Sequence, residues 1–144
     1  MIFLDAYALV ALASGEPAAD DVEAILRRPG ADPAVLSINL AEAADVLART
    51  YGVLVSTSRM ALSPILGDPV RMVDVDAEIA WRAAAIRSEY YAKRARAVSL
   101  ADCVLIGAAR ENDAIATSDP ALAEVARAEG VRVEGLADRQ GRKA

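Results

Sequence analysis

Four acidic residues stand at positions where carboxylates can do chemistry. Each lies at or near the start of an expected helix, and the set is Asp5, Glu42, Asp102 and Asp119. Carboxylate oxygens are the ligands that hard cations such as Mg²⁺ and Ca²⁺ prefer. An acid in the first turn of a helix also has a simpler use, because it accepts backbone N–H bonds and stabilises the helix by ~0.3–2 kcal/mol. For any one of these residues alone, both interpretations stay open.

Composition excludes several other catalytic chemistries. The 144 residues include no histidine, which removes Ser-His-Asp and Cys-His catalysis as well as His-ligated zinc. The single cysteine, Cys103, excludes an internal disulfide, and its apolar helical context favours an ordinary core residue. Catalysis is therefore left to carboxylates, hydroxyls and bases such as lysine.

The expected strands indicate where two of the acids lie. Asp5 ends the apolar run 1–4 and Asp119 follows the run 114–117, and both runs are typical of buried parallel strands. In open α/β sheets, ligands bind beyond the carboxyl ends of the strands, where the strand order reverses. If these two strands are neighbours at that point, the two carboxylates converge in one crevice. Their mutual repulsion then implies a cation between them.

The rest of the chain alternates short strands with amphipathic helices. Further strands are expected at 34–38, 70–74 and 131–134. Helix starts are indicated by capping pairs, namely Asn39 with Glu42, Ser99 with Asp102, and Asp119 with Pro120. This alternation predicts an α/β fold, a three-layer α/β/α sandwich around a five-stranded, mostly parallel sheet. We expect one domain over residues 1–137 and a frayed tail over residues 138–144.

Composition also bears on location and partners. No apolar run approaches the ~20 residues that span a bilayer, and no basic segment precedes the first apolar run, so we expect a cytoplasmic protein. The net charge of −5 argues against nucleic acid, although a cluster of cation-binding acids would account for part of it. Basic residues gather in two places, as a solvated face or as a nucleic-acid contact: Arg87, Lys93, Arg94 and Arg96, and then Arg139, Arg142 and Lys143.

Five segments follow one another in a characteristic order and spacing over nearly the whole chain. They are IFLDA (2–6), GEP (15–17), SINLAE (37–42), SLAD (99–102) and ATSD (116–119). Together they resemble the motifs of PIN-domain ribonucleases, specifically the VapC-like toxins of type II toxin–antitoxin pairs. The resemblance implies a parallel sheet in which the first and fourth strands are adjacent.

The same resemblance implies the site and the partners. It implies that the four acids, Asp5, Glu42, Asp102 and Asp119, bind Mg²⁺ or Mn²⁺, and that Thr117 supports a metal-bound water. It implies a cognate antitoxin protein that inhibits the chain. A homodimer is expected from the Ala-rich helices and from an apolar face formed by Trp81, Ile79 and Ile86, and the resemblance agrees with it.

The sequence departs from the family pattern at three positions that bear on a second metal site. Tyr7 stands where a small Ser or Asn is common, Ala121 where some members have a fifth acid, and Leu122 where Phe is frequent.

The expected activity is hydrolysis of RNA phosphodiester bonds. A carboxylate-held Mg²⁺ lowers the pKa of a bound water, which then attacks the phosphate; a second ion ~3.5–4 Å away would stabilise the leaving oxygen. The products would carry a 5′-phosphate and a 3′-hydroxyl. Single-stranded or loop RNA is the expected substrate, because its backbone is accessible and its bases can splay apart.

Competing interpretations fit the sequence less well. A haloacid-dehalogenase-type phosphatase needs a second Asp two residues after the first, where this chain has Tyr7. A receiver domain needs an acid pair at the end of the first strand, but Asp20 and Asp21 lie in an expected helix. The non-enzyme alternative is a PIN-like RNA-binding or interaction module with an impaired catalytic site. The acids present at all four positions argue against it.

Overall fold

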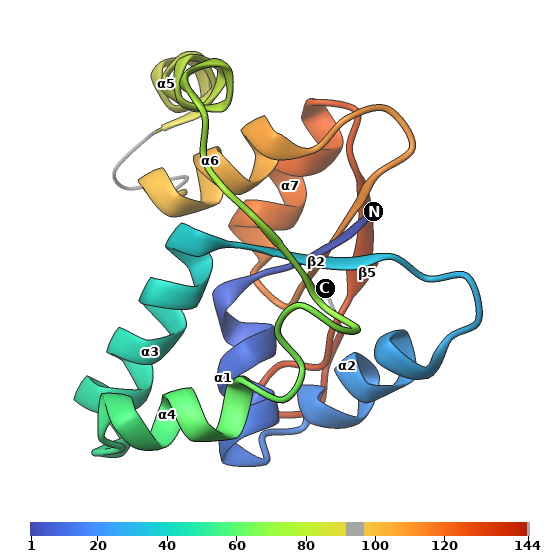
Figure 1. The fold of residues 1–144 in the computed structure, drawn as a ribbon. Helices are drawn as coiled ribbons and strands as arrows, with labels where there is room; N and C mark the ends of the chain where they lie inside the picture. Colours follow the sequence, from blue (N-terminus) through green and yellow to red (C-terminus); the bar gives the residue numbers. More distant parts are fainter. Residues whose placement is uncertain (92–96, 144) are drawn as a thin grey trace.

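The computed structural model describes residues 1–91 and 97–143 (Figure 1). The basic cluster that the sequence indicates around Lys93, Arg94 and Arg96 therefore lies outside the described residues.

A five-stranded parallel sheet forms the centre of the fold. Its strands are β1 (Ile2–Leu4), β2 (Pro33–Leu36), β3 (Arg71–Val73), β4 (Ala114–Thr117) and β5 (Arg132–Gly135). They are ordered β3-β2-β1-β4-β5, and all four pairings are parallel. The expected sheet is confirmed, and β1 and β4 are adjacent at the point where the strand order reverses. The residues of β1, β2 and β4 are all buried, as their apolar runs predict.

Helices cover both faces of the sheet, which completes the expected three-layer sandwich (Figure 1). One face carries α1 (Ala6–Ser14), α2 (Ala18–Arg27), α3 (Ser37–Tyr51) and α4 (Val55–Leu62). The other carries α5 (Ala77–Tyr90), α6 (Leu100–Ala108) and α7 (Pro120–Ala128). Alternate residues of β1 point into the two cores, Phe3 into one and Leu4 into the other.

Two of the three expected capping pairs are confirmed, Ser99 with Asp102 and Asp119 with Pro120. The Asp5 and Asp76 side chains accept backbone N–H bonds at the starts of α1 and α5. Ser99 and Asp102 form a complete capping box, with Asp102 N donating to Ser99 Oγ (3.0 Å) and Ser99 N donating to Asp102 Oδ2 (2.8 Å). Asp119 caps α7, with Pro120 in the first turn. The acids therefore do serve as helix caps.

The capping box expected at Asn39 and Glu42 is wrong. Strand β2 ends at Leu36 and α3 begins at Ser37, so Asn39 lies inside the first turn of the helix. The N-cap residue is Leu36, which makes no side-chain cap bond. Asn39 is only 1% exposed, and its side chain forms a hydrogen bond with the Glu42 carboxylate instead of accepting one from the N–H groups at the helix start. A short polar residue just after a strand fits either the N-cap or the first turn of a helix. The burial of Asn39 accompanies the second position here.

The apolar face proposed for a partner is also partly wrong. Ile79 and Ile86 are buried in the core formed with α6, and only Trp81 of that set is exposed, at 77%. Helix α5 packs closely on α6 at Gly107, where an added Cβ would lie 3.1 Å from the Ile79 carbonyl oxygen. Gly107 is thus the position that lets the two helix backbones approach.

The C-terminal residues pack back on the domain. Lys143 Nζ lies 2.8 Å from Asp21 Oδ1, and the Ala137 amide donates to Asp21 Oδ2. Arg139 donates to the Tyr51 hydroxyl at 3.0 Å. These contacts attach the segment to α2 and to the end of α3.

Among the helices that the structure describes, none is both long enough and apolar enough to cross a membrane.

Candidate active site

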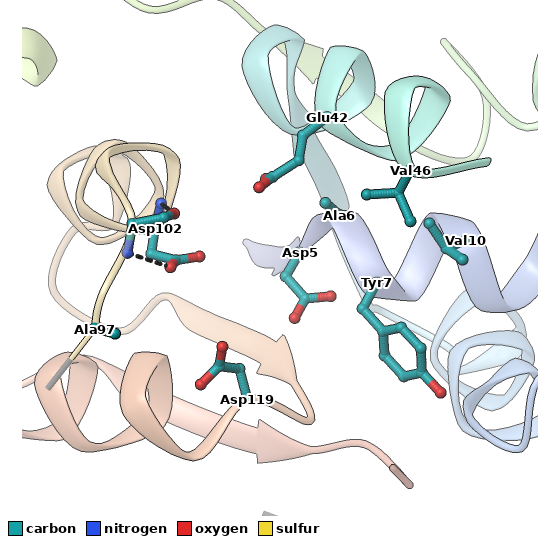
Figure 2. A pocket seen from close by; sticks show the side chains of 10 residues that line it. Asp5, Ala6, Tyr7, Val10, Glu42, Val46, Ala97, Asp102 and Asp119 are labelled. Carbon is teal, nitrogen blue, oxygen red and sulfur yellow. Dashed lines mark hydrogen bonds between the residues drawn. The ribbon is translucent and has the colours of Figure 1, made fainter. Parts of the chain in front are cut away.

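Asp5, Glu42, Asp102 and Asp119 line a single cavity of about 320 Å³ (Figure 2). They come from four different places: the end of β1, the second turn of α3, the first turn of α6, and the residue before α7. The cavity lies beyond the carboxyl ends of β1 and β4, where ligands bind in open α/β sheets. The convergence expected for Asp5 and Asp119 is therefore present, and Glu42 and Asp102, which the resemblance assigned to the same site, line the same cavity.

Three of these carboxylates use an oxygen to cap a helix. The bonds run from Ala8 N to Asp5 Oδ1 (2.8 Å), from Ser99 N to Asp102 Oδ2 (2.8 Å) and from Ala121 N to Asp119 Oδ1 (2.7 Å). Capping holds each side chain in one orientation and does not involve its second oxygen. Capping and ligand binding are thus compatible explanations for the same residues, because a carboxylate has two oxygens.

Thr117 connects two of the acids. It is fully buried at the end of β4, and its Oγ1 accepts a hydrogen bond from the Asp119 amide at 3.0 Å. Its hydroxyl donates to the Asp5 carboxylate. The single hydroxyl therefore fixes the backbone at Asp119 and the side chain of Asp5 together.

Asn39 has the corresponding relation to Glu42. Its amide group donates to the Glu42 carboxylate, one helical turn further along the same face of α3. The Asn39 Oδ1 atom is buried without a hydrogen-bond partner among the described residues. Sequence reasoning assigned Asn39 to the helix cap and missed this contact. The available signal was the three-residue spacing between a polar residue and an acid.

The cavity disfavours negative charge before any cation is present. Burial raises the pKa of Asp5 to about 7, and the charges of Asp102 and Asp119 add to that rise against the hydrogen bonds from Thr117 and Ala8. Burial likewise raises the pKa of Glu42 and of Asp102, and a neighbouring acid raises each further, Asp102 for Glu42 and Asp119 for Asp102. These carboxylates share one electrostatic environment, in which a bound cation would relieve repulsion.

The donor set fits a hydrated divalent cation better than a closed protein cage. Within the described residues, no group of three or more acidic, histidine or cysteine side chains is arranged to hold a metal ion. Mg²⁺ does not require such a group, since it keeps several waters and binds proteins through one or two carboxylates. All the acidic donors here are oxygens, and burial together with neighbouring acids raises the pKa of Asp5, Glu42 and Asp102. The residues present therefore suit Mg²⁺ or Mn²⁺.

The opposite wall of the cavity is apolar. It is formed by Tyr7 and Val10 of α1 and by Val46 of α3 (Figure 2). Sequence reasoning noted Tyr7 as a departure from the family pattern but did not identify this wall. The spacing of Tyr7 and Val10, three residues apart on one helix, was the available signal.

The sequence matches the family model described as PIN domain over residues 2–128. No curated protein matches it. Several solved structures share the fold, among them VapBC2 from Rickettsia felis bound to a DNA fragment from its promoter. That structure is 18% identical with a TM-score of 0.67, over 93% of this chain and 98% of the other.

Two further structures are similar over most of their length. A toxin–antitoxin complex from Klebsiella pneumoniae is 25% identical with a TM-score of 0.58, over 83% of this chain and 87% of the other. VapC20 from Mycobacterium tuberculosis, a toxin that cleaves the sarcin–ricin loop, is 19% identical with a TM-score of 0.58, over 74% of this chain and 79% of the other.

Proposed function

Because the chain belongs to the PIN domain family, we propose that it is a Mg²⁺- or Mn²⁺-dependent endoribonuclease and the toxin of a toxin–antitoxin pair. The observation that carries the proposal is the meeting of four carboxylates in one cavity at the point where the strand order reverses. RNA cleavage by the structurally similar VapC20 supports the choice of substrate class.

Asp5, Glu42, Asp102 and Asp119 are the residues that would hold the ion. When bound, the ion supplies a water of lowered pKa and positive charge beside the phosphate. The other residues prepare the site for it. Thr117 fixes Asp5 and Asp119, and Asn39 orients Glu42.

Asp5 has a further role at neutral pH. With a pKa of about 7, its carboxyl group is partly protonated in the absence of a cation, and it must release that proton before it can bind one. Binding of the ion should therefore strengthen as the pH rises towards 8. The hydrogen bonds from Thr117 and from the Ala8 amide favour the charged form and so assist this release.

Two partner proteins complete the proposal, an inhibitory antitoxin and a second copy of the chain. Two separate sets of apolar side chains are available to them. One is the groove formed by Ile38, Ala41, Val75 and Val104, and the other lies on and just before α4, where Leu54, Val55 and Met60 are exposed. An acidic cavity also suits insertion of an arginine or lysine from an antitoxin, in competition with the metal. Toxin–antitoxin complexes among the structural neighbours support the first partner.

We assign the nuclease to residues 1–137 and treat residues 138–144 as an appendage. The described ion pairs of this segment, such as Lys143 with Asp21, involve exposed side chains and contribute little stability.

The direct test is cleavage of mixed cellular RNA by the purified protein. Cleavage should appear with Mg²⁺ or Mn²⁺, stop in excess EDTA and leave 5′-phosphate ends. Glu42→Gln should lose activity, whereas Glu111→Gln, which changes an exposed acid outside the cavity, should keep it. Persistent cleavage in EDTA or 2′,3′-cyclic products would overturn the proposal. RNA binding without cleavage would favour the non-catalytic alternative instead.

A further inference from the structure

The cavity has two chemically different sides. Figure 2 shows Asp102 and Asp119 on one side, Tyr7, Val10 and Val46 on the other, and Asp5 and Glu42 between them. The acidic side accounts for the proposed metal chemistry. The apolar side takes no part in that chemistry, although it belongs to the same open space.

The Tyr7 side chain presents its ring to this space. Figure 2 shows its hydroxyl directed away from the carboxylates. That hydroxyl is buried and has no hydrogen-bond partner among the described residues. A buried hydroxyl that points away from the acids is poorly placed for acid–base chemistry, which leaves the aromatic surface as the functional part of the residue.

The backbone fixes the relation between this ring and the acids. Asp5 is the N-cap of α1, and Tyr7 lies in the first turn of the same helix. Val46 faces Tyr7 and Val10 from α3, one helical turn after Glu42. Helices α1 and α3 thus each place an apolar wall residue at a short, rigid offset from an acid, so a ligand held by Asp5 and Glu42 has its neighbouring atoms against this wall.

We propose that the apolar side is a base-binding subsite, in which the nucleobase next to the scissile phosphate of a single-stranded RNA stacks on Tyr7. This inference rests on the proposed function and adds the residue that positions the substrate. Stacking on an aromatic ring is available to every base, because each has a π-face. The volume of about 320 Å³ is at the lower end of the range for small-ligand sites, which suits a single nucleotide unit and not a duplex.

Matched variants separate the ring from the hydroxyl. Tyr7→Phe keeps the ring, and Tyr7→Leu keeps an apolar side chain without a π-face. Trp81→Leu is the control, because Trp81 is exposed on α5 and does not line the cavity. The probes are short single-stranded RNA oligonucleotides, together with copies in which a single abasic position is moved along the strand. Binding is measured at low salt, with Ca²⁺ and separately with EDTA.

Tyr7→Phe and Trp81→Leu should bind RNA as the wild type does, whereas Tyr7→Leu should bind roughly 5- to 150-fold more weakly, the range expected for one stacked base. Among the abasic oligonucleotides, the one that lacks the stacked base should bind the wild type more weakly, to a similar extent. The same oligonucleotide should show little further loss of binding to Tyr7→Leu. In cleavage assays, Tyr7→Leu should raise KM more than it lowers kcat. Val46→Phe, which fills the same space from α3, should weaken binding even if Tyr7→Leu fails to fold.

The outcomes distinguish this inference from the proposed function. Equal RNA binding by the wild type and Tyr7→Leu, or abasic effects of the same size in both, would overturn the subsite whether or not RNA is cleaved. Tyr7-dependent binding by a protein that never cleaves RNA would support the subsite and refute the nuclease. Absence of RNA binding under both conditions would overturn the subsite.

Discussion

The backbone amide of Asp119 donates a hydrogen bond of 3.0 Å to Thr117 Oγ1. The same hydroxyl donates to the Asp5 carboxylate, so the ends of the adjacent strands β1 and β4 are joined through one buried side chain. Groups that orient metal-binding carboxylates commonly affect metal affinity or activity by about 10- to 100-fold. Thr117 is therefore best described as a positioning residue of the proposed site.

Thr117→Val should damage the site without changing side-chain volume much. It removes the acceptor of the part-buried Asp119 amide and one of the hydrogen-bond partners of the buried Asp5 carboxylate, which should lower the free energy of unfolding by ~1–3 kcal/mol. Cleavage should fall roughly 10- to 100-fold. Thr117→Ser retains the hydroxyl and should remain close to the wild type in both urea unfolding and cleavage. Equal losses in the two variants would contradict a specific role for the hydroxyl, because serine retains it.

Asn39→Asp should destabilise the protein at neutral pH. It replaces the donor to Glu42 with a second buried carboxylate, and the two acids repel. The pKa values of both acids would be raised in the folded state, so the loss should be absent at low pH and appear as the pH rises through those values. The expected loss at pH 8 is ~1–3 kcal/mol, measured by urea unfolding across a pH series.

Asn39→Ser is the matched variant, because it removes the amide and adds no charge. Its loss of stability at pH 8 should be smaller than that of Asn39→Asp, because it removes a donor to Glu42 without adding a repelling charge. A pH-independent loss in Asn39→Asp would contradict the contact with Glu42.

The sequence predicts the sheet well because the apolar runs of β1, β2 and β4 leave few alternatives to buried strands. It also places Asp5 and Asp119 just after two such runs, where their carboxylates meet if the two strands are neighbours. The adjacency of β1 and β4 itself came from the family resemblance, because hydrophobic periodicity carries no information about strand order. The assignment of Glu42 and Asp102 to the site likewise came from the family resemblance, because both acids lie within helices and not at strand ends.

The errors arose where two local interpretations compete. Ser37, Ile38 and Asn39 all fit either a strand end or a first helical turn, and only burial of Asn39 against Glu42 decides the register. On α5, by contrast, the spacing was sufficient to avoid the error. Ile79 and Ile86 are seven residues apart and share a face, whereas Trp81 is two residues from Ile79 and lies on another side.

Gly107→Ala should weaken the packing of α6, the helix that carries Asp102. The added Cβ would lie 3.1 Å from the Ile79 carbonyl oxygen and 3.2 Å from the Ala83 amide nitrogen, so the helices must separate. Overpacking of this kind costs ~1–3 kcal/mol, partly offset by the better helix propensity of Ala. The melting temperature and the rate of RNA cleavage should both fall. Ala80→Leu, which adds bulk on the exposed side of α5, should change neither, and an unchanged Gly107→Ala would contradict the close packing.

Asp5→Asn tests whether Asp5 is a metal ligand or only a helix cap. The pKa of Asp5 is raised from 3.8 to about 7 in the folded protein, chiefly by burial. Between these values the unfolded chain loses a proton that the folded protein keeps, so stability falls as the pH rises through this window, by an amount on the order of 4 kcal/mol. Asparagine removes that cost while still accepting from the Ala8 amide, since Asn caps helices about as well as Asp. The metal-free variant should therefore be as stable as the wild type near pH 4 and more stable at pH 8, yet unable to cleave RNA.

Mn²⁺ should raise the melting temperature of the wild type more than that of Asp5→Asn, because stabilisation by a ligand follows its affinity for the folded state. Asp5→Ala, which also removes the cap, should be less stable than Asp5→Asn by ~1 kcal/mol at every pH. A variant Asp5→Asn that is destabilised at pH 8 and responds to Mn²⁺ as the wild type does would show that Asp5 is structural and that the metal-site proposal is wrong.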